Sequence, residues 1–169
     1  MFNPARKFLL AAALVGAMCL PGYGNVENSP IGGQQFEGKI VVQASPEAVW
    51  ALLTDLEQFS AIMGFKWLDG KKQVNMVGDT ARMEVWSDPC TYLLTYVKPH
   101  QELRLALEPD NASYICQKRW LLSPAEGGGT QLHLIDRYTE SGSQSAESLK
   151  SQVEAWENHL AQIKAAVEK

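Results

Sequence analysis

The sequence predicts an α+β fold in which an antiparallel sheet packs against a long C-terminal helix. Three observations predict it: a β-branched strand that stops at a Ser-Pro pair, a central region of short β-rich segments separated by turn residues, and a terminal segment whose apolar residues recur at helical spacing. The chain has 169 residues, of which 46% are apolar and 20% charged. This length and composition are ordinary for one folded domain with a sizeable core.

The N-terminus has the pattern of a secretion signal. Arg6 and Lys7 supply the positive region, an apolar run too short for a membrane span follows, and small residues precede a cleavage site after Gly24. The alternative is a retained anchor or a buried helix. We expect a periplasmic or secreted protein with no stable membrane span after signal removal. The expected division is a signal peptide at 1–24, a flexible leader at 25–35 and a folded domain at 36–169.

Removal of the signal makes the chain more acidic. It takes away Arg6 and Lys7 and no acidic residue, so the formal charge falls from −4 to −6. Because such a surface repels phosphate groups, we expect no nucleic acid among the partners.

The folded domain is expected to begin with a strand and two short helices. Residues 36–44 contain the run Ile-Val-Val and end before Ser45, which can cap a helix that starts at Pro46. Apolar residues at helical spacing predict this first helix and a second one from Leu56 to Met63, which ends at Gly64.

Residues 65–138 predict an antiparallel meander. Turn-forming residues, among them Asp69-Gly70, Gly78-Asp79 and the three glycines at 127–129, divide this region into short strands. The stretch from Leu103 to Leu107 alternates between leucine and other residues, which is typical of a strand with one apolar face. We interpret the glycine run as a hairpin loop rather than an anion cradle, because no helix follows it.

The last segment predicts the longest helix. Its apolar residues recur at spacings of four, three, four, three and four, which places them on one stripe of a helix about 25 residues long. A single amphipathic helix must bury such a stripe, and the concave apolar face of the sheet is the available surface. The stripe consists of Leu149, Val153, Trp156, Leu160, Ile163 and Val167.

The order of elements and the strand-to-helix junction from Ile40 to Phe59 resemble the START-like polyketide cyclase/dehydrase and lipid-transport superfamily. That group includes steroid-transfer domains and the major birch-pollen allergen. The resemblance covers residues 36–168. It implies a helix-grip fold: a curved, seven-stranded antiparallel sheet wrapped around the long C-terminal helix, with a cavity between them. Exported proteins that share this order of elements include accessory proteins of periplasmic methanol oxidation.

No motif for catalysis, a cofactor or a metal stands out. The sequence has no phosphate-binding glycine loop, no nucleophile elbow and no cysteine pair at metal spacing. His100 and His159 have no further ligand at close spacing, so we interpret both as solvated histidines. We expect no catalytic residue, no metal and no cofactor.

The leading hypothesis is a binding protein that holds a small hydrophobic molecule, a lipid or an aromatic compound, between the sheet and the last helix. Burial of the ligand's apolar surface, at about 25 cal/mol per Å², would supply the affinity. Strand alternation and helix stripes select the residues expected to line the cavity. They are Trp50, Leu53, Phe59, Met63, Met83, Val85, Tyr92, Leu94, Tyr96, Leu105, Leu134, Asp136, Tyr138, Trp156 and Leu160.

Two alternatives stay open. The first is an accessory module that binds another periplasmic protein through a surface such as Trp67, Trp86 and the neighbouring loops. The second is a cyclase-like enzyme in which Asp136 and Tyr138, which share the inward face of the last strand, perform acid–base chemistry. For Asp136 itself, a buried ion pair is the plainer interpretation.

Two cysteines remain after signal removal, Cys90 and Cys116, and an oxidising compartment permits a disulfide between them. If one strand separates theirs, their backbones lie about 9–10 Å apart, beyond the limit of about 7 Å for a disulfide. A bridge therefore requires Cys90 to lie in a loop, and the alternative is two buried free thiols.

Overall fold

The computed structural model describes residues 25–28, 33–140 and 146–169, so the predicted signal peptide and the expected helix caps at 141–145 lie outside the described residues. A single antiparallel sheet has the strand order β1-β2-β8-β7-β6-β5-β4-β3. No helix of the described part of the chain is both long and apolar enough to cross a membrane. The strands are β1 (Asn25–Asn28), β2 (Gln34–Val42), β3 (Lys66–Gly70), β4 (Thr80–Val85), β5 (Asp88–Lys98), β6 (Glu102–Pro109), β7 (Tyr114–Pro124) and β8 (Thr130–Glu140).

The sheet contains the expected meander and one further strand. Strands β2 to β8 are the seven that the resemblance implies, and β8 returns to pair with β2. The expectation of a flexible leader at 25–35 was wrong in part, because Asn25–Asn28 form β1 and β2 already begins at Gln34. β1 pairs with β2, whose backbone groups would otherwise form an unpaired sheet edge.

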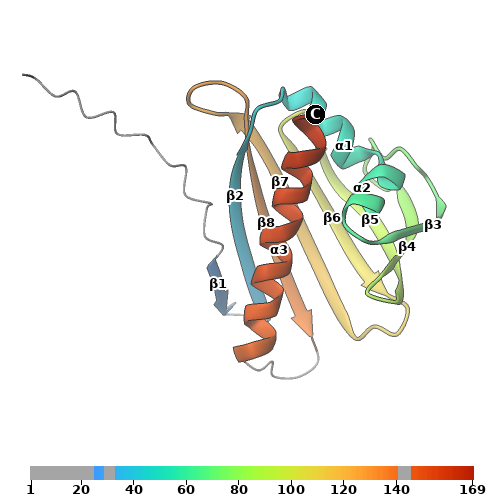
Figure 1. The fold of residues 1–169 in the computed structure, drawn as a ribbon. Coiled ribbons are helices and arrows are strands. Elements are labelled where there is room, and N and C mark those ends of the chain that lie inside the picture. Colours follow the sequence, from blue (N-terminus) through green and yellow to red (C-terminus); the bar gives the residue numbers. More distant parts are fainter. Residues whose placement is uncertain (1–24, 29–32, 141–145) are drawn as a thin grey trace, which may run out of the picture.

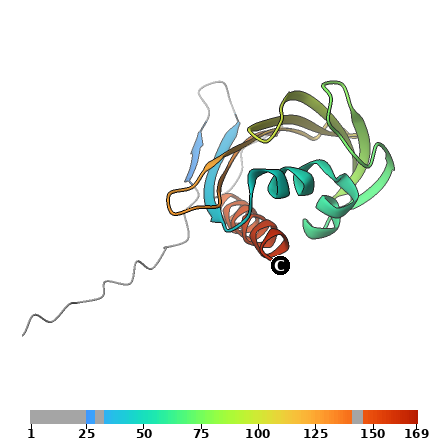
Figure 2. The same ribbon diagram turned by 90° about the horizontal axis from the view of Figure 1, so that it is seen from above.

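Three helices lie on the concave side of the sheet: α1 (Pro46–Thr54), α2 (Leu56–Ile62) and α3 (Ala146–Val167). The side chains of Ser45 and Asp55 accept hydrogen bonds from backbone N–H groups and cap α1 and α2. Figure 2 shows the sheet as an arc with all three helices inside it, and Figure 1 shows α3 running along β2. The predicted helix-grip arrangement is therefore confirmed.

Helix α3 packs closely on β2 because Gly38 has no side chain. A Cβ atom at Gly38 would lie 2.9 Å from the side chain of Leu160 and 2.8 Å from the ring of Phe36. Beside this contact, the rings of Phe36 and Trp156 stack with centroids 6.1 Å apart. Near the end of α3, Lys164 Nζ donates to a carbonyl oxygen of β2 at 2.7 Å. These contacts fix the helix along the first long strand of the sheet.

Candidate functional site

A small, partly open void lies between the concave face of the sheet and the helices over it. Its volume is about 20 Å³, which is enough for one water molecule and far below the roughly 300 Å³ or more of an ordinary ligand pocket. The wide cavity that the resemblance implies is therefore not observed at these residues, because side chains fill this part of the interior almost completely. The lining residues are Phe59, Phe65, Met83, Val85, Tyr92, Leu105, Leu107 and Lys118.

Two charged side chains from adjacent strands meet in this apolar interior. Lys118 on β7 and Asp136 on β8 stand opposite each other in the register. Lys118 Nζ lies 3.0 Å from Asp136 Oδ2, and the two side chains are only 6% and 2% exposed. The ammonium group also lies 4.4 Å from the ring centroid of Trp156 on α3, which is a cation–π contact. The pair thus connects the sheet to the terminal helix.

Burial and mutual attraction act in opposite directions on this pair. Burial raises the pKa of the Asp136 carboxyl group, and the positive charge of Lys118 offsets part of that rise. Burial by itself would lower the pKa of Lys118, but the neighbouring Asp136 and Cys116 raise it above its usual value. Two desolvated groups of this kind are tolerated in a core because each one pairs with the other.

His159 on α3 is the third ionisable residue of the cluster. The expectation that it is solvated was wrong: it is buried, with its ring 5.6 Å from Phe65 and 5.1 Å from Trp156 between centroids. Burial and the nearby charge of Lys118 lower the pKa of His159 to about 4. Its ring is therefore neutral at pH 7, and it hydrogen-bonds the backbone of Met63. The buried stripe of α3 is wider than the six apolar positions that predicted it.

Three buried polar atoms in this interior have no hydrogen-bond partner among the described residues. They are the hydroxyl oxygen of Tyr92, Oδ1 of Asp136 and Nδ1 of His159. Burial also raises the pKa of Tyr92, so its hydroxyl group stays protonated. An unpaired buried polar group costs about 1–3 kcal/mol. The three atoms are therefore the costly unpaired groups of this interior.

Most residues expected to line a cavity do lie in the core. Tyr138 is half-buried, and its ring stacks on Tyr114 with centroids 5.3 Å apart. The residues that lie in the core are Trp50, Leu53, Phe59, Met63, Met83, Val85, Tyr92, Leu94, Leu105, Leu134, Asp136, Trp156 and Leu160.

The inward orientation expected for Tyr96 was wrong. The register of β5 against β6 shifts between Leu94 and Tyr96, and a bulge of this kind interrupts the alternation of inward and outward side chains. Tyr96 is consequently 38% exposed on the outer face, where Arg104 lies 4.7 Å from its ring centroid.

The void also has lining residues that sequence reasoning missed: Phe65, Leu107 and Lys118. Lys118 lies two residues from both Cys116 and Trp120, which are buried, so strand alternation alone would have placed it inside. Lysine side chains are usually exposed, so Lys118 was not considered for the interior although the alternation of its strand points inward at this position.

The aromatic residues considered for a protein-binding surface differ in exposure. Trp86, in the turn between β4 and β5, is 52% exposed, and its ring lies 6.1 Å from that of Phe65. Trp67 on β3 is half-buried, with Lys72 Nζ 4.9 Å from its ring centroid. A role for this region in binding another protein stays a prediction.

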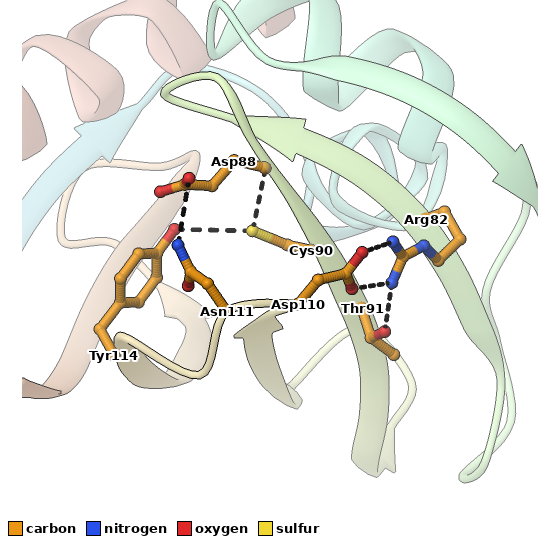
Figure 3. A network of polar contacts seen from close by, with 7 residues as sticks. All are labelled: Arg82, Asp88, Cys90, Thr91, Asp110, Asn111 and Tyr114. Atoms are coloured by element: carbon orange, nitrogen blue, oxygen red, sulfur yellow. Dashed lines mark hydrogen bonds and ion pairs between the residues drawn. The ribbon is translucent and has the colours of Figure 1, made fainter.

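Cys90 and Cys116 are both buried free thiols, so the disulfide considered from the sequence is not formed. Cys90 lies within β5 and Cys116 within β7, with β6 between them. The Cys90 thiol donates to the carbonyl oxygen of Asp88 over 3.2 Å, and it lies 3.5 Å from the hydroxyl oxygen of Tyr114. Figure 3 shows both contacts. Burial raises the pKa of Cys90 and raises that of Cys116 to about 12. Both thiols are therefore structural and chemically unreactive.

The same end of the sheet is closed by a surface ion pair. Both terminal nitrogens of Arg82 on β4 donate to the carboxylate of Asp110, which follows β6, at 2.6 and 2.5 Å. One of these nitrogens also donates to Thr91. In the part of the chain that the structure describes, no three His, Cys, Asp or Glu side chains are grouped so that they could hold a metal ion.

The curved sheet, the helix gripped by it and the polar cluster between them define a helix-grip protein. Family models and curated proteins give no match to the sequence. Among solved structures, protein CV1439 from Chromobacterium violaceum superposes with a TM-score of 0.62 at 19% identity, over 80% of this chain and 98% of that one. CalU16 from Micromonospora echinospora gives 0.60 at 17% identity, over 85% and 83% of the two chains.

A further neighbour is DynU16, a protein in the dynemicin biosynthetic locus. It gives a TM-score of 0.62 at 16% identity, over 80% of this chain and 47% of that chain. At these levels of identity, the likeness shows the shared fold alone.

Proposed function

We propose that the protein is an exported binding protein that holds a small, largely apolar molecule between the sheet and α3, with a hydroxyl group of that molecule next to the Lys118–Asp136 pair. The observation that carries the proposal is the set of unpaired polar atoms of Tyr92, Asp136 and His159 in an otherwise apolar interior. Native cores rarely leave such groups unpaired. A bound molecule with matching polar groups would satisfy them.

The chemistry of these atoms favours a hydroxyl group over a charged one. Asp136 Oδ1 is an acceptor, and so is Nδ1 of a neutral His159 whose other nitrogen donates to Met63. The hydroxyl group of Tyr92 either donates or accepts. Lys118 already has its countercharge in Asp136. The site therefore favours a neutral donor on an apolar body, such as a phenol or an alcohol. The occurrence of DynU16 in a biosynthetic locus is consistent with a small organic ligand.

Entry of the ligand requires side chains to move, because the void holds about one water molecule. Met63 and Met83 are both in the core, and their unbranched side chains change shape more readily than other apolar residues. Phe65 lines the void and also contacts His159. We infer that these three side chains rearrange to admit the ligand, and that binding is accompanied by local repacking rather than by filling of a preformed cavity.

Two probes that differ in one hydroxyl group test this proposal. We expect 1-naphthol to bind about tenfold more tightly than naphthalene, a difference of about 1.4 kcal/mol, in a titration followed by ¹H–¹⁵N NMR. The shifted amide signals should come from β5, β7, β8 and α3. Equal affinity for the two probes, or no binding of either one, would contradict the proposal.

A matched pair of variants locates the hydroxyl contact. Tyr92→Phe removes an unpaired buried hydroxyl group, so the free protein should gain up to about 1 kcal/mol of stability while the preference for naphthol over naphthalene falls. Tyr96→Phe makes the same change on the outer face and should alter neither property. If Tyr92→Phe leaves the preference unchanged, the hydroxyl contact is placed wrongly.

Export is tested by the mass of the mature protein. Cleavage after Gly24 would leave β1 intact, because β1 begins at Asn25. We expect the full chain, expressed in a Gram-negative host, to be recovered from the periplasmic fraction with a mass that corresponds to residues 25–169. Recovery of the uncleaved chain from the cytoplasm would refute this part of the proposal.

A further inference from the structure

A second hollow lies on the outer face of the sheet, on the opposite side from the helices. Its volume is about 440 Å³, which is within the range of small-molecule sites. Figure 2 shows that no helix covers this side of the arc. We call this hollow the arginine groove. The residues that line it with outward side chains are Thr95, Arg104, Ala106, Gln117, Arg119, Ile135 and Arg137.

The three arginines of the groove are held in place by their Nε atoms. Arg104 and Arg119 both donate through Nε to the same oxygen of Glu102, at 2.6 and 2.5 Å. Arg137 donates through Nε to Gln35 Oε1 at 3.0 Å. The terminal nitrogens of all three guanidinium groups have no hydrogen-bond partner within the described part of the chain. The groove therefore contains oriented donors that are still unused.

The groove is positively charged in an acidic protein. Its lining contains three arginines and no acidic residue, and the Glu102 carboxylate contacts two of the three, while the whole chain has a formal charge of −4. The side chains of Arg104 and Arg119 are 47% and 40% exposed, so they are accessible yet partly shielded from water. Arg104 is also held against the ring of Tyr96. Fixed, partly desolvated guanidinium groups of this kind favour carboxylates and phosphates.

We propose that the arginine groove is a binding site for a small molecule that carries an oxyanion, a carboxylate or a phosphate. Arg104 and Arg119 already bind one carboxylate, that of Glu102, which shows the kind of group to which this pair donates. The unused terminal nitrogens bind the oxyanion, and Gln117 supplies a neutral hydrogen-bonding group. The site is independent of the interior site, because its side chains lie on the other face of the same strands.

An NMR titration with sodium pyrophosphate at low ionic strength tests the groove. We expect saturable shifts of β6, β7 and β8 signals, with about tenfold weaker binding in Arg119→Gln and in Arg137→Gln. Lys150→Gln removes the same charge from α3, where this lysine is 78% exposed, and should leave the affinity within about twofold. Equal loss in all three variants, or no loss in any, would overturn the proposal. Because Arg137 hydrogen-bonds only to Gln35 within the described residues, that variant serves if Arg119→Gln does not fold.

The Glu102→Gln variant separates a binding site from a closed structural triad. It keeps an oxygen acceptor for the two Nε atoms but removes the carboxylate that Arg104 and Arg119 share. We expect the affinity for pyrophosphate to rise by about threefold or more in this variant, because the local positive charge increases. Unchanged or weaker binding would mean that Glu102 merely closes an ion-pair network, and would overturn the proposal.

Vesicles identify the source of the oxyanion. The groove binds a lipid headgroup if the protein sediments with phosphatidylglycerol vesicles but not with vesicles of phosphatidylcholine alone. In that case Arg119→Gln and Arg137→Gln should no longer sediment with the phosphatidylglycerol vesicles. Pyrophosphate binding without sedimentation assigns it to a soluble oxyanion. Failure of both probes would refute the site.

Discussion

The Asp136→Asn variant isolates the energetic role of the buried ion pair. The side chain keeps its size and an oxygen acceptor but loses its charge, which leaves the Lys118 ammonium group, 6% exposed, without its countercharge beside the ring of Trp156 and the thiol of Cys116. Removing one partner of a buried pair costs about 3–5 kcal/mol. For a domain of this size, a loss of that magnitude lowers Tm by about 10 °C or more.

A double variant gives the matched comparison. Lys118→Met combined with Asp136→Leu replaces both charges by apolar groups of similar volume, which is often neutral or stabilising by about 1–4 kcal/mol. The assay is urea unfolding, followed by tryptophan fluorescence, of wild type, Asp136→Asn and the double variant. A loss below about 1 kcal/mol in Asp136→Asn, or a double variant as unstable as the single one, would refute the reasoning.

The pH dependence of Asp136→Asn gives an independent check. Without Asp136, burial lowers the pKa of Lys118, so the folded state binds fewer protons than the unfolded chain at neutral to alkaline pH. Stability of the variant should therefore rise between about pH 7 and pH 10. Wild type should not show this rise, because Asp136 and Cys116 hold the pKa of Lys118 above its usual value.

Three further predictions concern other residues. The pKa of His159 is about 4 in the folded protein against 6.5 in the unfolded chain. Its neutral form therefore contributes up to about 3 kcal/mol of stability, which is complete above pH 6.5 and is lost as the pH falls from 6.5 through 4. The free energy of unfolding of His159→Phe, measured at a series of pH values, should depend less on pH over this range than that of wild type. Gly38→Ala should destabilise by about 1–3 kcal/mol in urea, because its Cβ would press on Leu160. Cys90 and Cys116 should react with a thiol reagent only after unfolding; rapid labelling of the native protein would contradict their burial.

The order of elements could be predicted because each element has a local signal. The Ser45-Pro46 pair starts α1 in the structure as expected, and the six-residue stripe of the tail falls on α3. β1 had no such signal: three of the four residues in Asn25–Asn28 are polar, and the segment pairs with the edge that β2 offers. A pairing that depends on a neighbour rather than on its own side chains is outside the reach of sequence periodicity.

The sequence predicted only part of the candidate site, for a similar reason. Alternation placed Asp136 inside correctly, and an ion pair was the plainer interpretation, but its partner Lys118 is opposite it only in the observed register. His159 was misjudged because Phe65, which helps to bury it, approaches from the loop between α2 and β3. Side chains that interact across elements are determined by tertiary packing, and one sequence does not display that packing.

The two proposed sites are built from the same strands, and the register of the sheet connects them. On β7, Lys118 is in the core while Arg119 lines the outer groove, and on β8 the same holds for Asp136 and Arg137. Because side chains alternate along a strand, a slip of one residue would exchange the two sets and place arginines in the core.

The bulge in β5 is a local case of such an exchange. It takes the ring of Tyr96 out of the interior and places it against Arg104, so an aromatic group that the sequence assigns to the ligand cavity instead supports the groove. Deleting Thr95, the extra residue of the bulge, should therefore restore a regular ladder in which Tyr96 directly follows the inward Leu94 and stays on the outer face opposite Arg104, so the affinity for pyrophosphate should remain within about twofold of wild type. A Thr95 deletion that folds but binds pyrophosphate about tenfold more weakly would show that the groove depends on the bulge itself and not on the contact between Tyr96 and Arg104.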